Sequence, residues 1–162
     1  MILLKVDLAK AFDTVAWPFL LEVLEHFGFL LCWRDWISAM LSIASTRVLT
    51  NGRAGRRICH ACGLRQGDPL SPFLFIIIME VLNVLITEAD RPPLSLDFSY
   101  IHMILELFAG ASGLATNLDK CAITPIRCSE EDVVAVRQVF PCRLQEFPTT
   151  YLGAPLSLSK LP

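Results

Sequence analysis

The stretch of the chain best suited to chemistry is a decapeptide at residues 63–72, which reads Gly-Leu-Arg-Gln-Gly-Asp-Pro-Leu-Ser-Pro. Gly63 and Gly67 free the backbone on either side of Gln66, and two prolines then precede a long apolar segment. Such a segment can present an amide side chain and bare backbone to a flat ligand such as a base pair. Turns also use glycine and proline, so these residue types alone are weak evidence.

Three other blocks carry a recognisable order of residues: 4–13 (LKVDLAKAFD), 113–120 (GLATNLDK) and 151–156 (YLGAPL). Together with the decapeptide, they resemble the reverse transcriptase domain of plant non-LTR (LINE-type) retrotransposons. The resemblance extends over nearly the whole chain. It implies RNA-directed DNA synthesis on an RNA template and a DNA primer, with Mg²⁺ as cofactor, in an α+β palm domain built on a ferredoxin-like sheet.

The resemblance assigns catalytic roles to two residues. Asp7 corresponds to a metal-binding aspartate at the end of a strand, and the backbone carbonyl of Leu8 corresponds to a second metal ligand. Lys120 corresponds to a lysine that assists the pyrophosphate leaving group. From the sequence alone, Asp7 can also be a strand-end carboxylate that caps a turn, and Lys120 can belong to an ordinary solvated loop.

Other positions correspond to binding residues of the family. Phe12 matches an aromatic floor that excludes a ribose 2′-hydroxyl, although it also suits the core. The residues that match nucleotide and template contacts are Arg65, Gln66, Gly67 and Asn117, and those that match the primer grip are Tyr151, Leu152 and Gly153. For the primer grip, a plain β-hairpin is the alternative interpretation.

One catalytic element of the family has no counterpart. Family members carry an aromatic-Ala-Asp-Asp turn after the long apolar helix, whereas no Asp-Asp pair occurs in this sequence. We interpret residues 1–162 as a partial palm domain with an internal deletion near 90–102. Asp7 alone cannot hold two metal ions, since magnesium needs several converging oxygen ligands. Asp97 is the one nearby carboxylate that could substitute, but nothing around it resembles the turn.

This incomplete site predicts a catalytically inactive fragment. The alternatives are a non-catalytic remnant that binds nucleic acid, and an inert product of a misassembled gene. Five arginines between residues 47 and 65 favour the first alternative, because residues 36–67 contain no acidic side chain. The formal charge of −2 argues against strong binding to phosphates, and a solvated hairpin would also account for the arginines.

Composition bounds the remaining possibilities. The 162 residues suffice for one domain. The hydrophobic fraction of 54% predicts exposed apolar surface, which would pack against parts of the palm domain that this chain lacks. Residues 73–86 form the longest apolar stretch, which is interrupted by Glu80 and Asn83 and is shorter than the roughly 20 residues that span a bilayer. With no signal peptide evident, we expect an intracellular protein that is not bound to a membrane.

The six cysteines predict no disulfide scaffold. Cys59, His60 and Cys62 have a zinc-like spacing, but no second pair completes four ligands. Reduced, partly buried thiols are therefore expected.

The expected elements follow the hydrophobic periodicity. They are strands at 2–7, 94–100, 120–125 and 149–156, a hairpin at 47–59, and helices at 18–27, 31–43, 70–88, 101–112 and 129–140. Apolar residues lie on both faces of the 70–88 helix, which predicts burial nearly all round. The order predicts an α+β fold, with one sheet and helices on one face.

Overall fold

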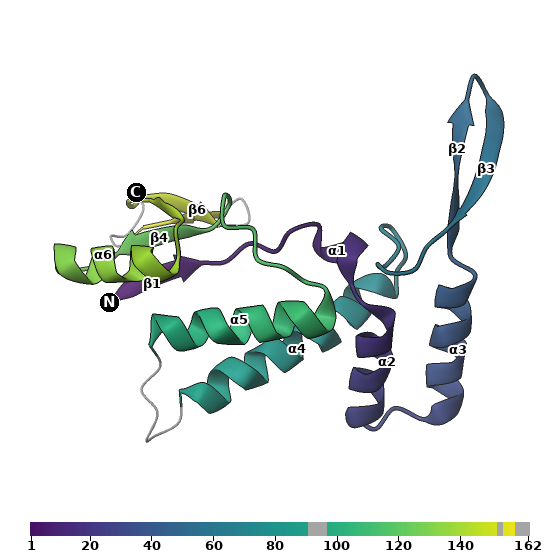
Figure 1. The fold of residues 1–162 in the computed structure, drawn as a ribbon, viewed down its shortest axis with the longest axis horizontal. Helices are drawn as coiled ribbons and strands as arrows, with labels where there is room; N and C mark the ends of the chain where they lie inside the picture. The colour runs from purple at the N-terminus through teal and green to yellow at the C-terminus, as the bar shows by residue number, and fades with distance from the viewer. Residues whose placement is uncertain (91–96, 152–153, 158–162) are drawn as a thin grey trace.

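The computed structural model describes residues 1–90, 97–151 and 154–157. Helices and strands are mixed along these ranges, so the predicted α+β class is confirmed. Figure 1 shows an elongated molecule with a small sheet at one end, two long helices in the middle, and a hairpin that projects from the other end. The strands form three separate sheets within the described ranges, rather than the single sheet expected from the sequence.

The N-terminal part of the chain runs from β1 (Ile2–Lys5) through α1 (Ala11–Thr14) into α2 (Trp17–His26) and α3 (Leu31–Ser42). Pro18 lies in the first turn of α2, where its missing N–H costs no helical bond. Gly28 then adopts a φ of 78°, which lets the chain reverse into α3. Both helices agree with the predicted ranges.

The predicted hairpin is present as β2 (Ser45–Thr50) and β3 (Arg53–Cys59). Its turn places Asn51 and Gly52 at φ values of 51° and 76°, which the Asn-Gly pair tolerates better than other residues. A β-bulge lies between Arg47 and Leu49. Almost every residue of the two strands is exposed, so no core contact fixes the hairpin.

The long apolar helix α4 (Ser71–Ala89) is buried on one face only. Leu74, Ile78 and Leu82 are buried, whereas Phe73 and Ile76 are 65% and 62% exposed. The prediction of burial nearly all round is therefore wrong. By length and composition α4 could cross a bilayer, but a core helix passes the same test, and α4 packs against α2 and α5.

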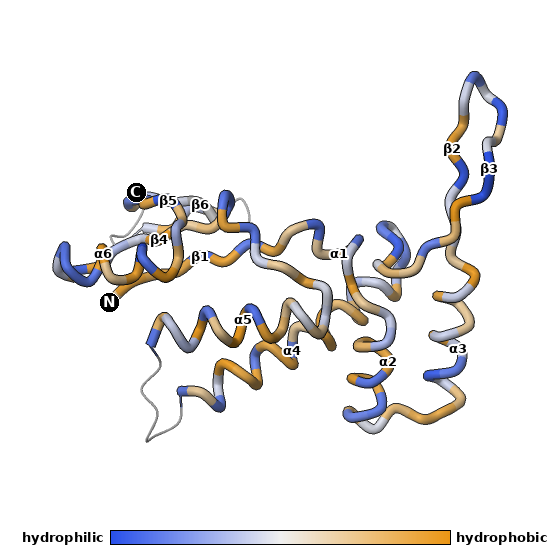
Figure 2. The backbone as a smooth tube through the Cα atoms, viewed as in Figure 1, coloured by the Kyte–Doolittle hydropathy of each residue, from blue (hydrophilic) through white to orange (hydrophobic). Residues whose placement is uncertain are grey.

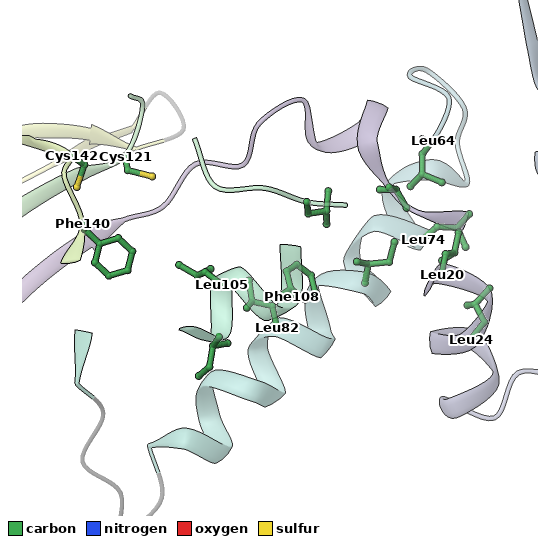
Figure 3. Close-up of a cluster of buried hydrophobic side chains, with 14 of the residues drawn as sticks. Leu20, Leu24, Leu64, Leu74, Leu82, Leu105, Phe108, Cys121, Phe140 and Cys142 are labelled. Carbon is green, nitrogen blue, oxygen red and sulfur yellow. The ribbon is translucent and has the colours of Figure 1, made fainter. Parts of the chain in front are cut away.

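Helix α5 (Phe98–Ser112) begins three residues before its predicted start. The strand expected at 94–100 is wrong for Phe98 to Tyr100, which form the first turn of α5; residues 91–96 lie outside the described ranges. Gly113 ends the helix at a φ of 79°, as predicted. Figure 3 shows Leu105 and Phe108 of α5 beside Leu82 of α4 in the core.

The main sheet has the order β1-β4-β5, with β4 at Ala122–Pro125 and β5 at Arg143–Leu144. β1 and β4 pair antiparallel, and β4 and β5 pair parallel. Helix α6 (Glu130–Val139) starts with the predicted capping box between Ser129 and Asp132. The chain closes with a hairpin of β6 (Thr149–Tyr151) and β7 (Ala154–Leu156).

Candidate functional site

Asp7 lies shortly after β1. Its backbone is hydrogen-bonded to the loop at residues 116–121, which is distant in the sequence. The Asp7 carbonyl accepts a hydrogen bond from the Asn117 N–H at 2.8 Å, and the Asp7 N–H donates to Cys121 Sγ at 3.3 Å. The Ala9 N–H donates to the Ala115 carbonyl at 2.8 Å. These contacts bring two of the predicted site residues, Asp7 and Asn117, together.

The same contacts orient the peptide groups of Leu8. Leu8 and Thr116 form an isolated antiparallel bridge, flanked by the bonds of Asp7 and Ala9. In this bridge pattern the flanking residues carry the hydrogen bonds, so the carbonyl of Leu8 points away from Thr116. The Leu8 carbonyl is therefore on the side opposite the loop.

Lys120 follows a tight turn that begins at Asn117. The N–H groups of Lys120 and Cys121 both donate to the Asn117 carbonyl, at 3.1 and 3.0 Å. The Lys120 side chain is exposed, one residue before the buried Cys121. Burial raises the pKa of the Cys121 thiol above its ordinary value, so this group stays protonated beside Asp7 at neutral pH.

The decapeptide is tied to the segment that follows Asp7. The Gly63 N–H donates to the Val15 carbonyl at 2.8 Å, and the Leu64 N–H donates to the carbonyl of Phe12. Gln66 Nε2 donates to Asp13 Oδ1 at 3.1 Å. Residues 7–15 therefore bridge the Asn117 loop and the decapeptide.

Gly63 cannot be replaced without strain at this junction. Its φ is 86°, and a Cβ atom there would lie 2.6 Å from the Asp13 carbonyl oxygen. Gly67 has the same φ but open space around it. The two glycines thus have different roles: Gly63 permits a close backbone approach, whereas Gly67 only turns the chain.

Phe12 stacks on Phe75 of α4, with ring centroids 5.0 Å apart and an interplanar angle of 19°. The ring is partly buried against the core. Phe12 therefore packs against the core, as the alternative interpretation held.

A cavity of about 340 Å³ lies between the base of the β2–β3 hairpin and the decapeptide. Its polar lining includes Asp13, Thr46, His60, Arg65 and Gln66. Sequence reasoning did not single out Asp13, although its position directly after Phe12 in the 4–13 block was a usable signal. The cavity joins a cation, a carboxylate and an amide, which are groups that bind the polar edge of a nucleotide.

The residues around Asp7 do not fit a two-metal centre. Within residues 1–90, 97–151 and 154–157, no three side chains of His, Cys, Asp or Glu converge. Asp97 lines a different cavity with Met1 and Ile2, at the opposite end of β1 from Asp7. At roughly 3.3 Å per residue, Ile2 and Asp7 are about 16 Å apart. Asp97 does not replace a lost ligand.

The zinc-like spacing of Cys59, His60 and Cys62 does not produce a metal site. All six cysteines of the chain are free thiols, as expected. His60 Nε2 is 2.6 Å from the hydroxyl of Thr46, a contact across the base of the hairpin.

The hairpin that matches the primer grip lies beside β1. Tyr151 is the last residue of β6 and pairs with Ala154 of β7; Leu152 and Gly153 lie outside the described residues. Thr149 and Leu156 from this hairpin share a groove with residues 3–6 of β1.

The chain is similar in sequence to known proteins. The sequence profile described as "Reverse transcriptase (RNA-dependent DNA polymerase)" matches residues 1–102. The Pol polyprotein of the type-1 retrotransposable element R2 of Popillia japonica is 40% identical over 76 residues, 47% of this chain. That of the type-2 element R2DM of Drosophila melanogaster is 29% identical and covers 91% of this chain. An uncharacterised mitochondrial protein of Arabidopsis thaliana is 46% identical over 43 residues, 26% of this chain and 35% of its own length.

The chain spans only 12% and 15% of the two polyproteins. The profile nevertheless covers more than half of the chain, and the residues that it matches include Asp7 and the decapeptide. The chain belongs to the reverse transcriptase (RNA-dependent DNA polymerase) family.

Proposed function

We propose that this chain is a partial palm domain of an RNA-directed DNA polymerase that keeps a nucleotide and template surface but cannot catalyse synthesis. The observation that carries this proposal is the donor set around Asp7, which offers one carboxylate and the Leu8 carbonyl. Two-metal nucleotidyl transfer needs several carboxylates to hold both ions about 4 Å apart.

The order of the elements supports an internal deletion in a ferredoxin-like palm. β1 pairs antiparallel with β4, although helices α2, α3, α4 and α5 separate the two strands in the sequence. Helix α4 ends at Ala89 and α5 begins at Phe98, so the chain between them is shorter than two strands of typical length and a turn. The alignment with the Drosophila polyprotein runs over 168 positions, more than the 162 residues of this chain. The relative therefore carries residues that have no counterpart here.

The retained residues would act as a platform rather than as a catalyst. Asp13 fixes the Gln66 amide by accepting from Nε2, so that the amide oxygen is free to face a ligand. Arg65 adds a cation at the same cavity. We expect RNA template and DNA primer to contact this face weakly, with Asn117 and Lys120 at the neighbouring loop and residues 151–153 at the primer side.

Primer extension tests the loss of catalysis. The purified chain is incubated with an RNA template, a DNA primer, four deoxynucleoside triphosphates and Mg²⁺ or Mn²⁺. We expect no template-dependent product above the level of the Asp7→Ala variant. Extension that disappears in Asp7→Ala would contradict the proposal, and its loss in Asp97→Ala would show that a distant carboxylate takes part.

A second candidate function is nucleic-acid binding by the β2–β3 hairpin. Arg47 lies directly opposite Arg57 in the strand register, an arrangement that like charges disfavour. The ion pair found among the described residues, between Arg34 and Glu25, involves no hairpin arginine. Phosphate groups would relieve this repulsion. Figure 2 shows the hydrophilic tip of the hairpin, well away from the apolar helices.

We propose that the protein acts inside the cell and does not associate with a membrane. Helix α4 is apolar, but it packs against α2 and α5 and carries Glu80, Asn83 and Glu88.

A further inference from the structure

The β2–β3 hairpin carries arginine side chains on both of its faces. Arg47 lies directly opposite Arg57, and Arg53 lies opposite Thr50. Between the pairs that flank the β-bulge, β2 has one residue and β3 has two, so the extra residue belongs to β3 and the alternation of side chains along β2 is regular. Positions 47 and 50 of β2 therefore face opposite sides of the ribbon. Arg47 and Arg57 lie on one face, and Arg53 lies on the other.

These arginines are exposed and lack acidic partners. All residues from 46 to 60 are exposed, and Figure 1 shows the hairpin projecting beyond the end of α3. Residues 36–67 contain no acidic side chain, and no carboxylate in the described part of the chain forms an ion pair with a hairpin arginine. Arg57 Nη2 donates to the Ile43 carbonyl at 3.3 Å, which holds this side chain at the base of the hairpin. The hairpin is therefore a basic arm that a ligand can reach from both sides.

The dimensions of a two-stranded ribbon suit one groove of duplex DNA. The strands of such a ribbon lie about 4.8 Å apart, and side chains on both faces bring its thickness to about 10 Å. Only Asn51 and Gly52 separate the last strand pair, so the tip is no wider than the strands. The major groove of B-form DNA, about 12 Å wide, admits a β-ribbon, whereas the minor groove is only about 6 Å wide. Side chains cannot read the deep, narrow major groove of A-form RNA.

We propose that the hairpin inserts into the major groove of double-stranded DNA, with the arginines of its two faces on the phosphates of the two strands. This binding mode rests on the nucleic-acid binding proposed above for the hairpin and specifies the form of nucleic acid. A single strand engages one face at a time, and proteins that hold single strands stack the bases on aromatic side chains. Residues 45–59 contain no aromatic residue. Because the contacts are to phosphates, binding has little sequence preference and falls steeply with salt.

Fluorescence anisotropy of the full chain compares four labelled probes of one sequence at low salt: a DNA duplex, an RNA–DNA hybrid, an RNA duplex and single-stranded RNA. The hybrid and the RNA duplex are A-form, so we expect the DNA duplex to bind about fivefold more tightly than each of the other three probes, or better. Arg47→Gln and Arg53→Gln test the two faces separately, since both side chains are exposed and outside the core. Each substitution should reduce the slope of log K against log salt by about 0.9 for the DNA duplex. The control Arg137→Gln, on α6, should leave the slope unchanged.

Dimethyl sulfate reactivity of the bound duplex locates the groove, because guanine N7 lies in the major groove and adenine N3 lies in the minor groove. At saturating protein, we expect guanine N7 to be protected and adenine N3 to stay reactive. Equal or tighter binding of any of the other three probes, a salt slope that only one of the two substitutions changes, or protection at adenine N3 alone would overturn this binding mode. Nucleic-acid binding by the hairpin would still stand in those cases, whereas a chain that binds none of the four probes contradicts both proposals.

Discussion

The Asp7 carbonyl accepts the Asn117 N–H at 2.8 Å, and this bond joins the end of β1 to the loop that precedes β4. Because the donor is a backbone group, the bond holds the two segments together whatever side chain stands at position 117. The Asn117 side chain is therefore free for another role. We expect Asn117→Ala to change the free energy of unfolding by less than about 1 kcal/mol. A loss of several kcal/mol, measured by urea unfolding, would show that the side chain is structural.

The two glycines of the decapeptide should respond differently to alanine. Gly63→Ala combines a positive φ with a clash against the Asp13 carbonyl, so we expect a loss of about 2–4 kcal/mol in the free energy of unfolding. Gly67→Ala meets open space at the same φ and should cost about 1 kcal/mol. Equal costs for the two variants would mean that the approach of Gly63 to Asp13 is not formed in solution.

Alanine should change the free energy of unfolding in opposite directions at two glycines, Gly110 within α5 and Gly113 directly after it. A Cβ at Gly113 would clash with the Thr14 carbonyl oxygen, at a φ of 79°. Gly110 lies inside the helix with nothing within 4 Å. We expect Gly113→Ala to destabilise the chain by several kcal/mol, and Gly110→Ala to stabilise it by about 0.5–1 kcal/mol. Thermal unfolding of the two variants measures the difference.

The exposed apolar surface should make the isolated chain aggregate. Trp36, Met40 and Ile43 follow a helical spacing along one side of α3 and its end, and Trp36 is 65% exposed. Figure 2 shows further apolar stretches along α4. Large side chains left in water forfeit roughly 1.5–3 kcal/mol each, against a total stability of typically 5–15 kcal/mol.

We therefore expect the chain to bind an apolar dye and to aggregate as its concentration rises. The triple variant Trp36→Glu/Ile43→Lys/Phe73→Glu should be more soluble and bind less dye, because it changes exposed positions only. Ile37→Asp, at a buried neighbouring position of α3, should instead unfold the chain. An unmodified chain that stays soluble at high concentration and binds no dye would refute this prediction.

Stability should fall at alkaline pH because of two buried thiols. Burial raises the pKa of Cys121 and Cys142 above the ordinary thiol value of 9.0. A raised folded pKa contributes stability that is complete below the unfolded pKa and is lost as the pH rises toward the folded pKa. We expect the free energy of unfolding to decrease above about pH 9. The decrease should be smaller in Cys121→Ala/Cys142→Ala and unchanged in Cys32→Ala, whose thiol is exposed.

Binding by the arginine hairpin predicts a salt-dependent signal. Arg56→Ala/Arg57→Ala should weaken binding to single-stranded RNA and reduce the slope of log K against log salt by about 0.7 per lost phosphate contact. Arg137→Ala, on α6 at the other end of the molecule, is the control (Figure 1). Affinity of about tens of micromolar or weaker is expected. No binding at low salt would eliminate this function.

Local rules account for what the sequence predicted correctly. The Asn51-Gly52 turn, the Ser129 capping box and the end of α5 at Gly113 each depend on a few neighbouring residues. The error at Phe98 has a local cause as well. Apolar residues alternate from 94 to 100, which is typical of a strand, but Phe98, Ile101 and Leu105 also repeat at helical spacing. Packing against α4 stabilises the helix.

Tertiary contacts could not be predicted in the same way. The bond from Gln66 to Asp13 and that from Asp7 to Cys121 join residues far apart in the sequence, which no periodicity reveals. The exposure of Phe73 and Ile76 was missed because composition shows that a helix is apolar but not which faces find partners. Figure 3 shows that core residues come from α2, α4 and α5 and also from distant parts of the chain, such as Cys121 and Phe140.

Metal binding distinguishes an incomplete catalytic centre from a complete one. Mn²⁺ is titrated into the chain and its free concentration is followed by electron paramagnetic resonance, with Asp7→Ala as the control. A single carboxylate and one carbonyl predict only weak binding, in the millimolar range or weaker, that differs little between the two proteins. Two Mn²⁺ ions bound with micromolar affinity and lost in Asp7→Ala would contradict the account, because they would require a complete catalytic centre.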